Sequence, residues 1–239
     1  MRLIKARIQN YRSIIDTGEF EVEDLKTIMV GPNEAGKTVI LKALQQLSKP
    51  KEVDGFEALR DYPRSKYNDI TSEKVLPKDI TVVTGWFRLD EDDAEIVPAE
   101  FHDCIYKLYK NLDNRVYHSL ENGPSKIRYK DIRGDLARLM SHLDKQYGIE
   151  HPDEDTGKPS NVLRTINQSW NDNTLISEDK SKELQSFLEN NFALIEEDNN
   201  KEEERYEKLK TLIEFNEQID NVLSILDKRT PVFILFNNY

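Results

Sequence analysis

The chain has 239 residues, enough for one large domain or two small ones. Its formal net charge is −11, so its bulk charge excludes general binding to nucleic acid, and a DNA contact would need a local basic patch or another part of an assembly. A single cysteine, Cys104, excludes an internal disulfide and suits a reducing compartment.

Targeting signals are absent from the sequence as printed. No apolar run approaches the length of a transmembrane helix, and Met1–Lys5 lacks the apolar core of a signal peptide. We therefore expect a cytoplasmic protein that makes no contact with a membrane.

The first thirty residues predict three strands. Leu3–Tyr11 alternates apolar and charged residues, Asp16–Gly18 is typical of a turn, and Glu19–Glu23 alternates again. Lys26–Val30 predicts a short buried strand. Apolar residues then recur at helical spacing up to about Leu47, which predicts a helix.

Between that strand and that helix, Gly31–Thr38 fits the phosphate-loop pattern G-x-x-x-x-G-K-[ST]. Gly31 and Gly36 let the backbone bend around a phosphate chain, and the helix that follows adds its positive end. Lys37 would supply a charge for the β- and γ-phosphates, and the Thr38 hydroxyl suits Mg²⁺. The alternative is a chance match in a glycine-bearing turn, which the flanking strand and helix disfavour.

The next segment changes from loop to sheet. Residues 50–78 are loop-like and include the cluster Asp61–Tyr67. Ile80–Leu89 predicts a strong strand, and 104–112 with 115–120 completes a β-meander. The acids of Asp90–Glu95 could open a helix, form a solvated turn or, less readily, hold a metal, since they lack the spacing of a calcium loop.

Residues 131–229 predict helices. One apolar face runs from Ile132 to Leu143, a polar loop follows at Gly148–Pro159, and Ser177 could cap a helix that contains Leu184. A further apolar stripe has one polar position; its members are Leu209, Leu212, Asn216, Ile219, Leu223 and Leu226. This stripe suits a short coiled coil or an antiparallel helix pair formed with the Leu184 helix, and we favour the pair.

The chain closes with the apolar run Thr230–Phe236, which predicts a fully buried strand. A buried strand is a poor place for a domain to end, so we expect the chain to be the front part of a longer protein.

Two stretches together carry a family resemblance. Ile8–Ile14 and Gly31–Thr38 resemble the N-terminal ATPase segment of the SMC/RecF/OLD group, which has an ABC-type head, and are similar to AAA family ATP-binding proteins. The resemblance implies an α/β fold: a P-loop NTPase lobe with a β-meander over 1–130, an α-helical insertion over 131–229, and a strand returning to the head over 230–239.

The resemblance also implies the site residues. The nucleotide-binding residues would be Asn33, Glu34, Ala35, Gly36, Lys37, Thr38 and Arg12, with ATP and Mg²⁺ as ligands. Lys37 would be catalytic and Thr38 would bind the metal. Arg12 matches a position near the nucleotide, although a plain surface arginine is as good an interpretation.

Some parts that the group needs are missing. The sequence has no signature Ser-Gly-Gly loop, no histidine in a switch context and no Asp-Glu after the last strand, where Asn237 and Asn238 stand instead. In that group two heads sandwich ATP, and each supplies its signature loop to the other. This chain would therefore carry half of a site that residues beyond it complete.

The leading hypothesis is an ATPase segment acting in DNA repair or anti-phage defence. ATP would bridge a homodimer, an effector or nuclease module could be a partner, and DNA would bind through the full assembly. The alternative is a non-catalytic module that binds ATP and switches contacts without turnover. A third, weaker possibility is a kinase or transferase, which would need a catalytic acid and an ordered pocket near Asp61–Tyr67.

Overall fold

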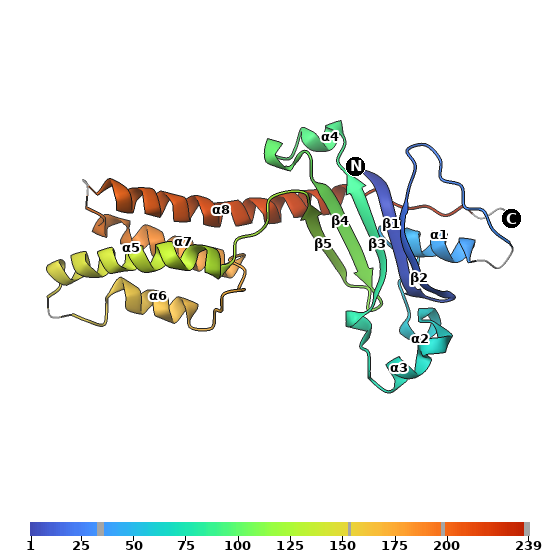
Figure 1. Ribbon diagram of the computed structural model, residues 1–239, viewed down its shortest axis with the longest axis horizontal. Helices are drawn as coiled ribbons and strands as arrows, with labels where there is room; N and C mark the ends of the chain where they lie inside the picture. The colour runs from blue at the N-terminus through green and yellow to red at the C-terminus, as the bar shows by residue number, and fades with distance from the viewer. Residues whose placement is uncertain (33–35, 153, 197–198, 237–239) are drawn as a thin grey trace. The chain divides into compact units, whose positions relative to one another are not determined.

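In this computed structural model, the described residues are 1–32, 36–152, 154–196 and 199–236. The chain divides into two compact units, Met1–Pro124 with Leu223–Tyr239 and Ser125–Val222. The first unit is built on a sheet and the second consists of helices (Figure 1). The division falls inside the last helix, so that helix contributes residues to both units.

The sheet of the first unit is antiparallel, in the order β2-β1-β3-β4-β5. Its strands are β1 (Arg2–Tyr11), β2 (Ile14–Glu21), β3 (Thr81–Arg88), β4 (Ile105–Asn111) and β5 (Val116–Glu121). The ends of β1, β3, β4 and β5 each lie within one residue of the predicted ends, so these four predictions are confirmed. The exception is β2, because the chain reverses at Arg12 and Ser13 and the predicted turn at Asp16–Gly18 lies inside the strand.

Helices of the first unit are short. They are α1 (Lys37–Gln45), α2 (Ala58–Asp61), α3 (Tyr67–Thr71) and α4 (Glu91–Ala94), with 3₁₀ turns at Arg64–Lys66, Pro77–Asp79 and Ala99–Phe101. The chain just after α1 packs tightly on the sheet. A Cβ built on Gly85 of β3 would lie 2.8 Å from the Leu47 side chain, so a larger residue there would force neighbouring side chains to move.

The acidic stretch Asp90–Glu95 forms a capped helix. The Asp90 and Asp93 side chains each accept a hydrogen bond, 3.0 Å long, from the other's backbone N–H. Asp93 is fully buried and also pairs with Arg229 at 2.6 Å. Burial raises the pKa of Asp93, but hydrogen bonds from the Met1 ammonium, the Asp90 N–H and Arg229 hold it at about 2.

One lysine is buried on the face of the sheet that α1 covers. Lys110 of β4 is 5% exposed, and its Nζ donates to the Gln46 Oε1 at 3.1 Å. Within the described ranges, no carboxylate lies close enough to Lys110 to form an ion pair. Burial, with a contribution from the charge of Lys49, lowers the pKa of Lys110 to about 8.

This lysine predicts a pH dependence of stability. Between pH 8 and 10.5 the unfolded chain keeps the proton that the folded chain has lost, so the free energy of unfolding rises with pH, by about 1–3 kcal/mol. Lys110→Met should remove the rise, whereas Lys78→Met, an exposed control, should keep it. Urea denaturation at about pH 7.5 and 9.5 measures both. If the free energy of unfolding of Lys110→Met still rises with pH as in wild type, Lys110 is not the cause of the rise.

The strand predicted before the phosphate loop is not formed. Residues 26–30 have no regular secondary structure, and Ile28 and Val30 are 68% and 91% exposed. A strand needs a neighbour for its backbone hydrogen bonds. The five strands of the described sheet pair only with one another, so this apolar segment has no partner strand there.

The final predicted strand is also not formed. Residues 230–236 have no regular secondary structure, and the remaining residues, including Asn237 and Asn238, lie outside the described ranges. The Phe233 N–H donates to the Ser48 carbonyl at 2.8 Å, and its ring lies 6.3 Å from that of Phe87. The run therefore lies against the sheet unit through single contacts and not through a strand ladder.

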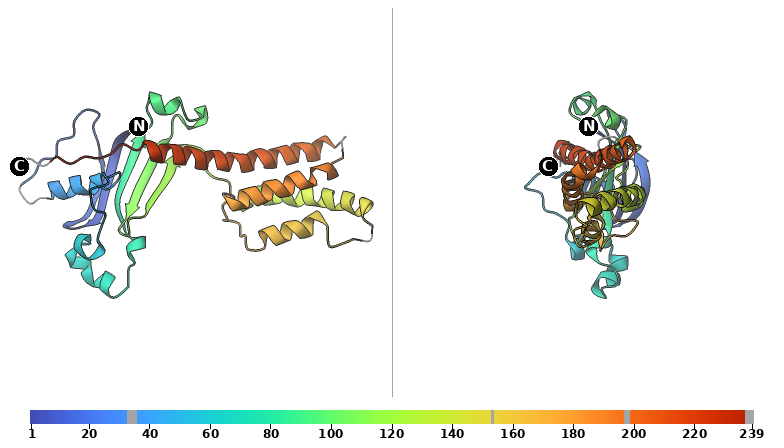
Figure 2. Two further views of the ribbon diagram at one scale, coloured as in Figure 1. Left: turned by 180° about the vertical axis from the view of Figure 1, so that it is seen from behind. Right: turned by 90° about the vertical axis from the view of Figure 1, so that its left-hand side faces the viewer.

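The second unit is a bundle of helices (Figures 1 and 2). They are α5 (Tyr129–Glu150), α6 (Pro159–Asn167), α7 (Asp179–Asn191), a 3₁₀ turn at Phe192–Leu194, and α8 (Asn200–Arg229). Leu143 of α5, Leu184 of α7 and Leu209 of α8 belong to one apolar core. No helix in the described part of the chain is long and apolar enough to cross a bilayer.

The polar position in the apolar stripe of α8, Asn216, forms hydrogen bonds to the backbone of neighbouring segments. Asn216 is fully buried; its Nδ2 donates to the carbonyls of Ile127 and Ile176, at 3.1 and 2.5 Å, and its Oδ1 accepts from the Ile127 N–H at 2.7 Å. These bonds lie within the unit, as expected when the stripe packs inside a bundle.

Candidate functional site

The phosphate loop leads directly into α1. Gly36 immediately precedes the helix with φ 85° and ψ 9°, a left-handed conformation that favours glycine. The first turn of α1 contains no acidic residue, so no side chain there competes with a phosphate for the positive end of the helix. Both features fit a loop that receives an anion.

Lys37 and Thr38 open this helix. The Lys37 Nζ donates to the carbonyls of Gly31, at 2.5 Å, and Pro32, at 2.7 Å, so the ammonium lies against the loop itself. Thr38 is exposed. Asn33, Glu34 and Ala35 lie outside the described residues.

Arg12 occupies the reversal between β1 and β2. Its backbone is left-handed, with φ 53°, and its N–H donates to the Asp61 carbonyl at 2.6 Å. Its Nε donates to the Asp61 Oδ1 at 2.9 Å. Ser13, the next residue, brings its Oγ within 3.6 Å of the position that a Cβ on Gly36 would take. The segment that carries Arg12 therefore lies beside the phosphate loop.

Asp61 is the centre of a charged cluster that the sequence did not identify. Its Oδ1 accepts from Arg12 and from the Arg60 Nε at 3.2 Å, and its Oδ2 accepts from the Arg60 Nη2 at 2.8 Å and the Glu57 N–H at 3.0 Å. Burial raises the pKa of Asp61, but the bonds from Arg60, Glu57 and Arg12 outweigh it, so the pKa lies below its usual value.

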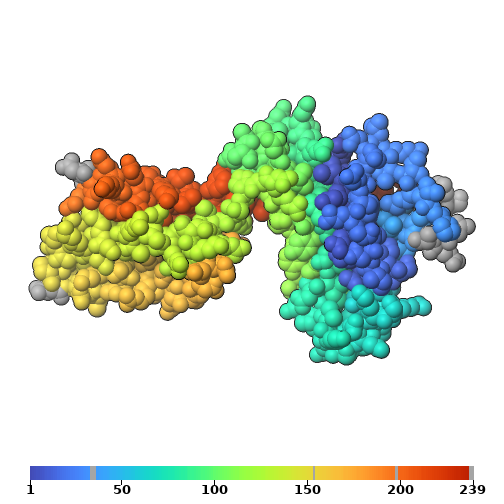
Figure 3. All heavy atoms as spheres, viewed as in Figure 1, coloured from blue at the N-terminus to red at the C-terminus, as the bar shows by residue number. Residues whose placement is uncertain are grey.

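Beside this cluster is a cavity of about 660 Å³. We call it the arginine pocket; its lining includes Arg12, Ser13, Arg60, Tyr62, Arg64 and Ser65. Figure 3 shows the first two strands and the segment around α2 meeting at the molecular surface. The sequence signal for the pocket is the run Asp61–Tyr67, which is rich in basic and aromatic residues.

An ordered pocket near Asp61–Tyr67 is one of two features that a kinase or transferase would need. The other is a free catalytic acid. Four hydrogen bonds occupy the lone-pair sites of the Asp61 carboxylate, which leaves it unsuited to accept a proton from a substrate. The pocket therefore presents cationic donors and no free acid from Asp61.

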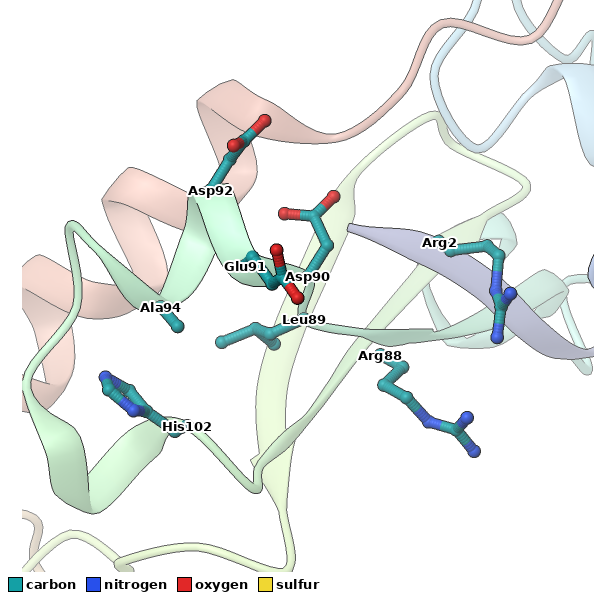
Figure 4. A pocket seen from close by; sticks show the side chains of 8 residues that line it. All are labelled: Arg2, Arg88, Leu89, Asp90, Glu91, Asp92, Ala94 and His102. Atoms are coloured by element: carbon teal, nitrogen blue, oxygen red, sulfur yellow. The ribbon is translucent and has the colours of Figure 1, made fainter.

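A second hollow, of about 730 Å³, has a mixed lining. Figure 4 shows Arg2 and Arg88 on one side and Asp90, Glu91 and Asp92 on the other. Its lining contains no residue of the phosphate loop. Among the residues that the structure describes, no group of three or more histidine, cysteine, aspartate or glutamate side chains is placed to hold a metal ion.

Comparison with known proteins adds one finding. No curated protein matches the chain. A family model described as an AAA ATPase domain matches residues 1–231, which include the phosphate loop, Arg12, the whole of the helical unit and most of the sheet unit. The chain therefore belongs to the AAA ATPase domain family.

Proposed function

We propose that this AAA ATPase domain is the ATP-binding segment of an SMC/RecF/OLD-like protein. The observation that carries the proposal is the start of α1, where a left-handed Gly36, a helix end without acids and Lys37 stand together. On nucleotide binding, the Lys37 ammonium would exchange the carbonyls of Gly31 and Pro32 for the β- and γ-phosphates. The family match supports nucleotide binding at this loop.

Mg²⁺ fits the same place. The hydroxyl of the exposed Thr38 is the oxygen ligand that the loop offers, and phosphate oxygens would supply others. Mg²⁺ held there would supply positive charge to the phosphates. Lys37 would hold the terminal phosphates in place and stabilise the charge that develops on them.

We propose further that two copies share ATP. The described residues contain no group of three or more histidine, cysteine, aspartate or glutamate side chains placed to hold a metal ion, and the proposal assigns the completion of the metal site to other residues. The roles in DNA repair or anti-phage defence, with an effector or nuclease module and DNA bound through the full assembly, rest on the resemblance of Ile8–Ile14 and the phosphate loop. A cytoplasmic location fits the buried, unpaired Cys104.

The alternative function is a nucleotide-gated interaction module that binds ATP without turnover. Binding needs the loop and Lys37, whereas hydrolysis also needs a group that orients water. The two functions share a ligand and differ in phosphate release.

The test measures three quantities on the full chain: MgATP affinity by calorimetry, phosphate release, and mass in solution with and without ATP. The leading proposal expects binding, an ATP-dependent dimer, and release. The alternative expects binding and a dimer without release. Absence of MgATP binding would contradict both.

A further inference from the structure

The second hollow of the sheet unit, about 730 Å³ in volume, has a basic side and an acidic side (Figure 4). We call it the mixed-charge hollow. Its basic side is formed by Arg2 and Arg88, which stand directly opposite each other in the pairing of β1 with β3. Like charges in such cross-strand positions destabilise a sheet, so an anion within reach of both guanidinium groups would be bound favourably.

The two arginines differ in their partners. The Arg2 Nη2 lies 2.8 Å from the Asp24 Oδ1, and this pair is open to solvent and therefore weak. Arg88 is exposed and, among the residues that the structure describes, pairs with no carboxylate. An incoming carboxylate would therefore meet one guanidinium without an ion pair and a second that can exchange its partner.

The acidic side is formed by α4 and the residue before it. Asp90 contacts the Met1 ammonium at 2.5 Å and forms the capping box of the helix with Asp93. Glu91 and Asp92 are exposed, and within the described ranges neither forms an ion pair. Both of these carboxylates are therefore available to a ligand, and replacing them leaves the cap of the helix in place.

The lining narrows the class of ligand. Glu91 and Asp92 would repel nucleic acid, a polyphosphate or an anionic membrane surface, so the ligand carries positive charge as well as negative. Leu89 and Ala94 are half-buried in the lining and can receive the aliphatic stem of a lysine or arginine. The volume falls in the range of sites for small organic ligands, which a short stretch of peptide can also fill.

Shape and charge together favour a partner protein over a second copy of this chain. A hollow receives a protruding segment, whereas two copies of the same hollow facing each other across a two-fold axis would enclose a void. The charged groups available to a ligand are exposed, so one contact contributes little and several must act together. A peptide segment with charges of both signs meets both conditions.

We propose that the mixed-charge hollow is a docking site for a segment of a partner protein that carries two basic side chains and, after a short spacer, an acidic one. The acidic side chain lies between Arg2 and Arg88, and the basic side chains pair with Glu91 and Asp92. The lining includes no described residue of the phosphate loop, so the inference goes beyond the nucleotide site and does not depend on it.

The probes are peptides with blocked, neutral ends, Arg-Arg-Gly-Gly-Glu and its reverse, labelled with a neutral dye. Fluorescence anisotropy with the full chain at low ionic strength should show one of the two orders binding about threefold or more tighter than the same peptide with Gln in place of Glu. Binding should weaken in about 0.5 M salt, because exposed charges are then screened.

Two sets of variants test the two sides of the hollow. Arg88→Ala should weaken the glutamate peptide about three- to fivefold and change the glutamine peptide less than about 1.5-fold. Glu91→Gln combined with Asp92→Asn should weaken both peptides about fivefold or more, because both carry the arginines. Arg115→Ala and Glu52→Gln, which change exposed residues outside the hollow, are the matched controls and should leave both affinities unchanged.

A charge exchange separates direct pairing from an indirect effect. Arg88→Glu should bind a peptide with Lys in place of Glu about threefold tighter than it binds the glutamate peptide, which reverses the wild-type order of affinity. Because Arg88 is exposed and forms no ion pair within the described ranges, its variants should melt at the wild-type temperature or above.

Three results would overturn the inference. They are equal affinity of wild type for the glutamate and glutamine peptides, wild-type affinity for the glutamate peptide in Arg88→Ala, and no reversal of the order in Arg88→Glu. A mass in solution that doubles with protein concentration in wild type but not in Arg88→Glu would also overturn it and assign the hollow to a second copy. Absence of MgATP binding by wild type would contradict the proposed function alone.

Discussion

Replacing Lys37 with alanine is expected to weaken MgATP binding about 100-fold, equivalent to about 2.7 kcal/mol. The ammonium is the mobile cation of the loop, and in the free protein it contacts only the carbonyls of Gly31 and Pro32 among the described residues. Its removal leaves the β- and γ-phosphates without their charge-assisted donor. Calorimetry and ligand-induced thermal stabilisation measure the loss independently.

The matched control is Lys51→Ala, which removes an exposed lysine after α1 and should bind MgATP like wild type. Lys37→Ala should also unfold at nearly the same urea concentration as wild type, because the two hydrogen bonds that it loses are exposed. Wild-type affinity in Lys37→Ala would mean that the loop is a glycine-bearing turn and not a nucleotide site.

The phosphate-loop motif can be recognised in the sequence because its information is local. Four fixed positions lie within eight residues, Gly31–Thr38, and each has its own physical reason. The structure confirms the helix that follows, and it shows a left-handed backbone at Gly36 just before that helix. The strand predicted at 26–30, before the loop, is not formed. An apolar composition predicts burial, but it does not identify a neighbouring strand with which the segment could pair.

The sheet was predictable for a related reason. Alternation along Leu3–Tyr11 records a more buried and a less buried face, and the β-branched run at Ile80–Leu89 records a strand that is buried on both faces, so these strands lie where expected. The start of β2 was wrong because Arg12 takes the left-handed conformation at the reversal without a glycine to signal it. The short α2 and α3 are too brief to show a helical period.

The arginine pocket was not predictable because its parts are distant in the chain. Arg12 and Asp61 are 49 positions apart and meet through a hydrogen bond between side chains. Arg12 lies in the stretch Ile8–Ile14 and Asp61 in the cluster Asp61–Tyr67, but neither pattern indicates that the two segments meet, and the interpretation of Arg12 as a plain surface arginine was open. The side-chain network shows instead that Arg12 is tied to a buried carboxylate beside the loop.

Asp61 should therefore matter for stability as well as for the pocket. Asp61→Ala is expected to lower the free energy of unfolding by about 2–4 kcal/mol. It removes four hydrogen bonds, leaves the Glu57 N–H unpaired and places Arg12 and Arg60 side by side without a counter-charge. Both guanidinium groups reach solvent, which keeps the loss below that of a fully enclosed ion pair.

Urea denaturation measures this loss, with Asp69→Ala as control. Asp69 faces Lys74 across 3.8 Å in a more exposed pair, so its removal should cost about 0.5 kcal/mol or less. If Arg12 and Arg60 repel each other once the carboxylate is gone, adding Arg60→Ala to Asp61→Ala should recover part of the stability. A double variant less stable than Asp61→Ala would show that repulsion is not the main cost.

The pH dependence provides a separate check on the same carboxylate. The pKa of Asp61 is lowered in the folded chain relative to the ordinary value of 3.8, so its stabilising contribution is complete above about pH 5 and is lost as the pH falls below that value. Asp61→Ala has no such contribution to lose. The difference in free energy of unfolding between Asp61→Ala and wild type should therefore become smaller in acid. If this difference stays constant from neutral pH to about pH 3, packing and not charge accounts for the effect.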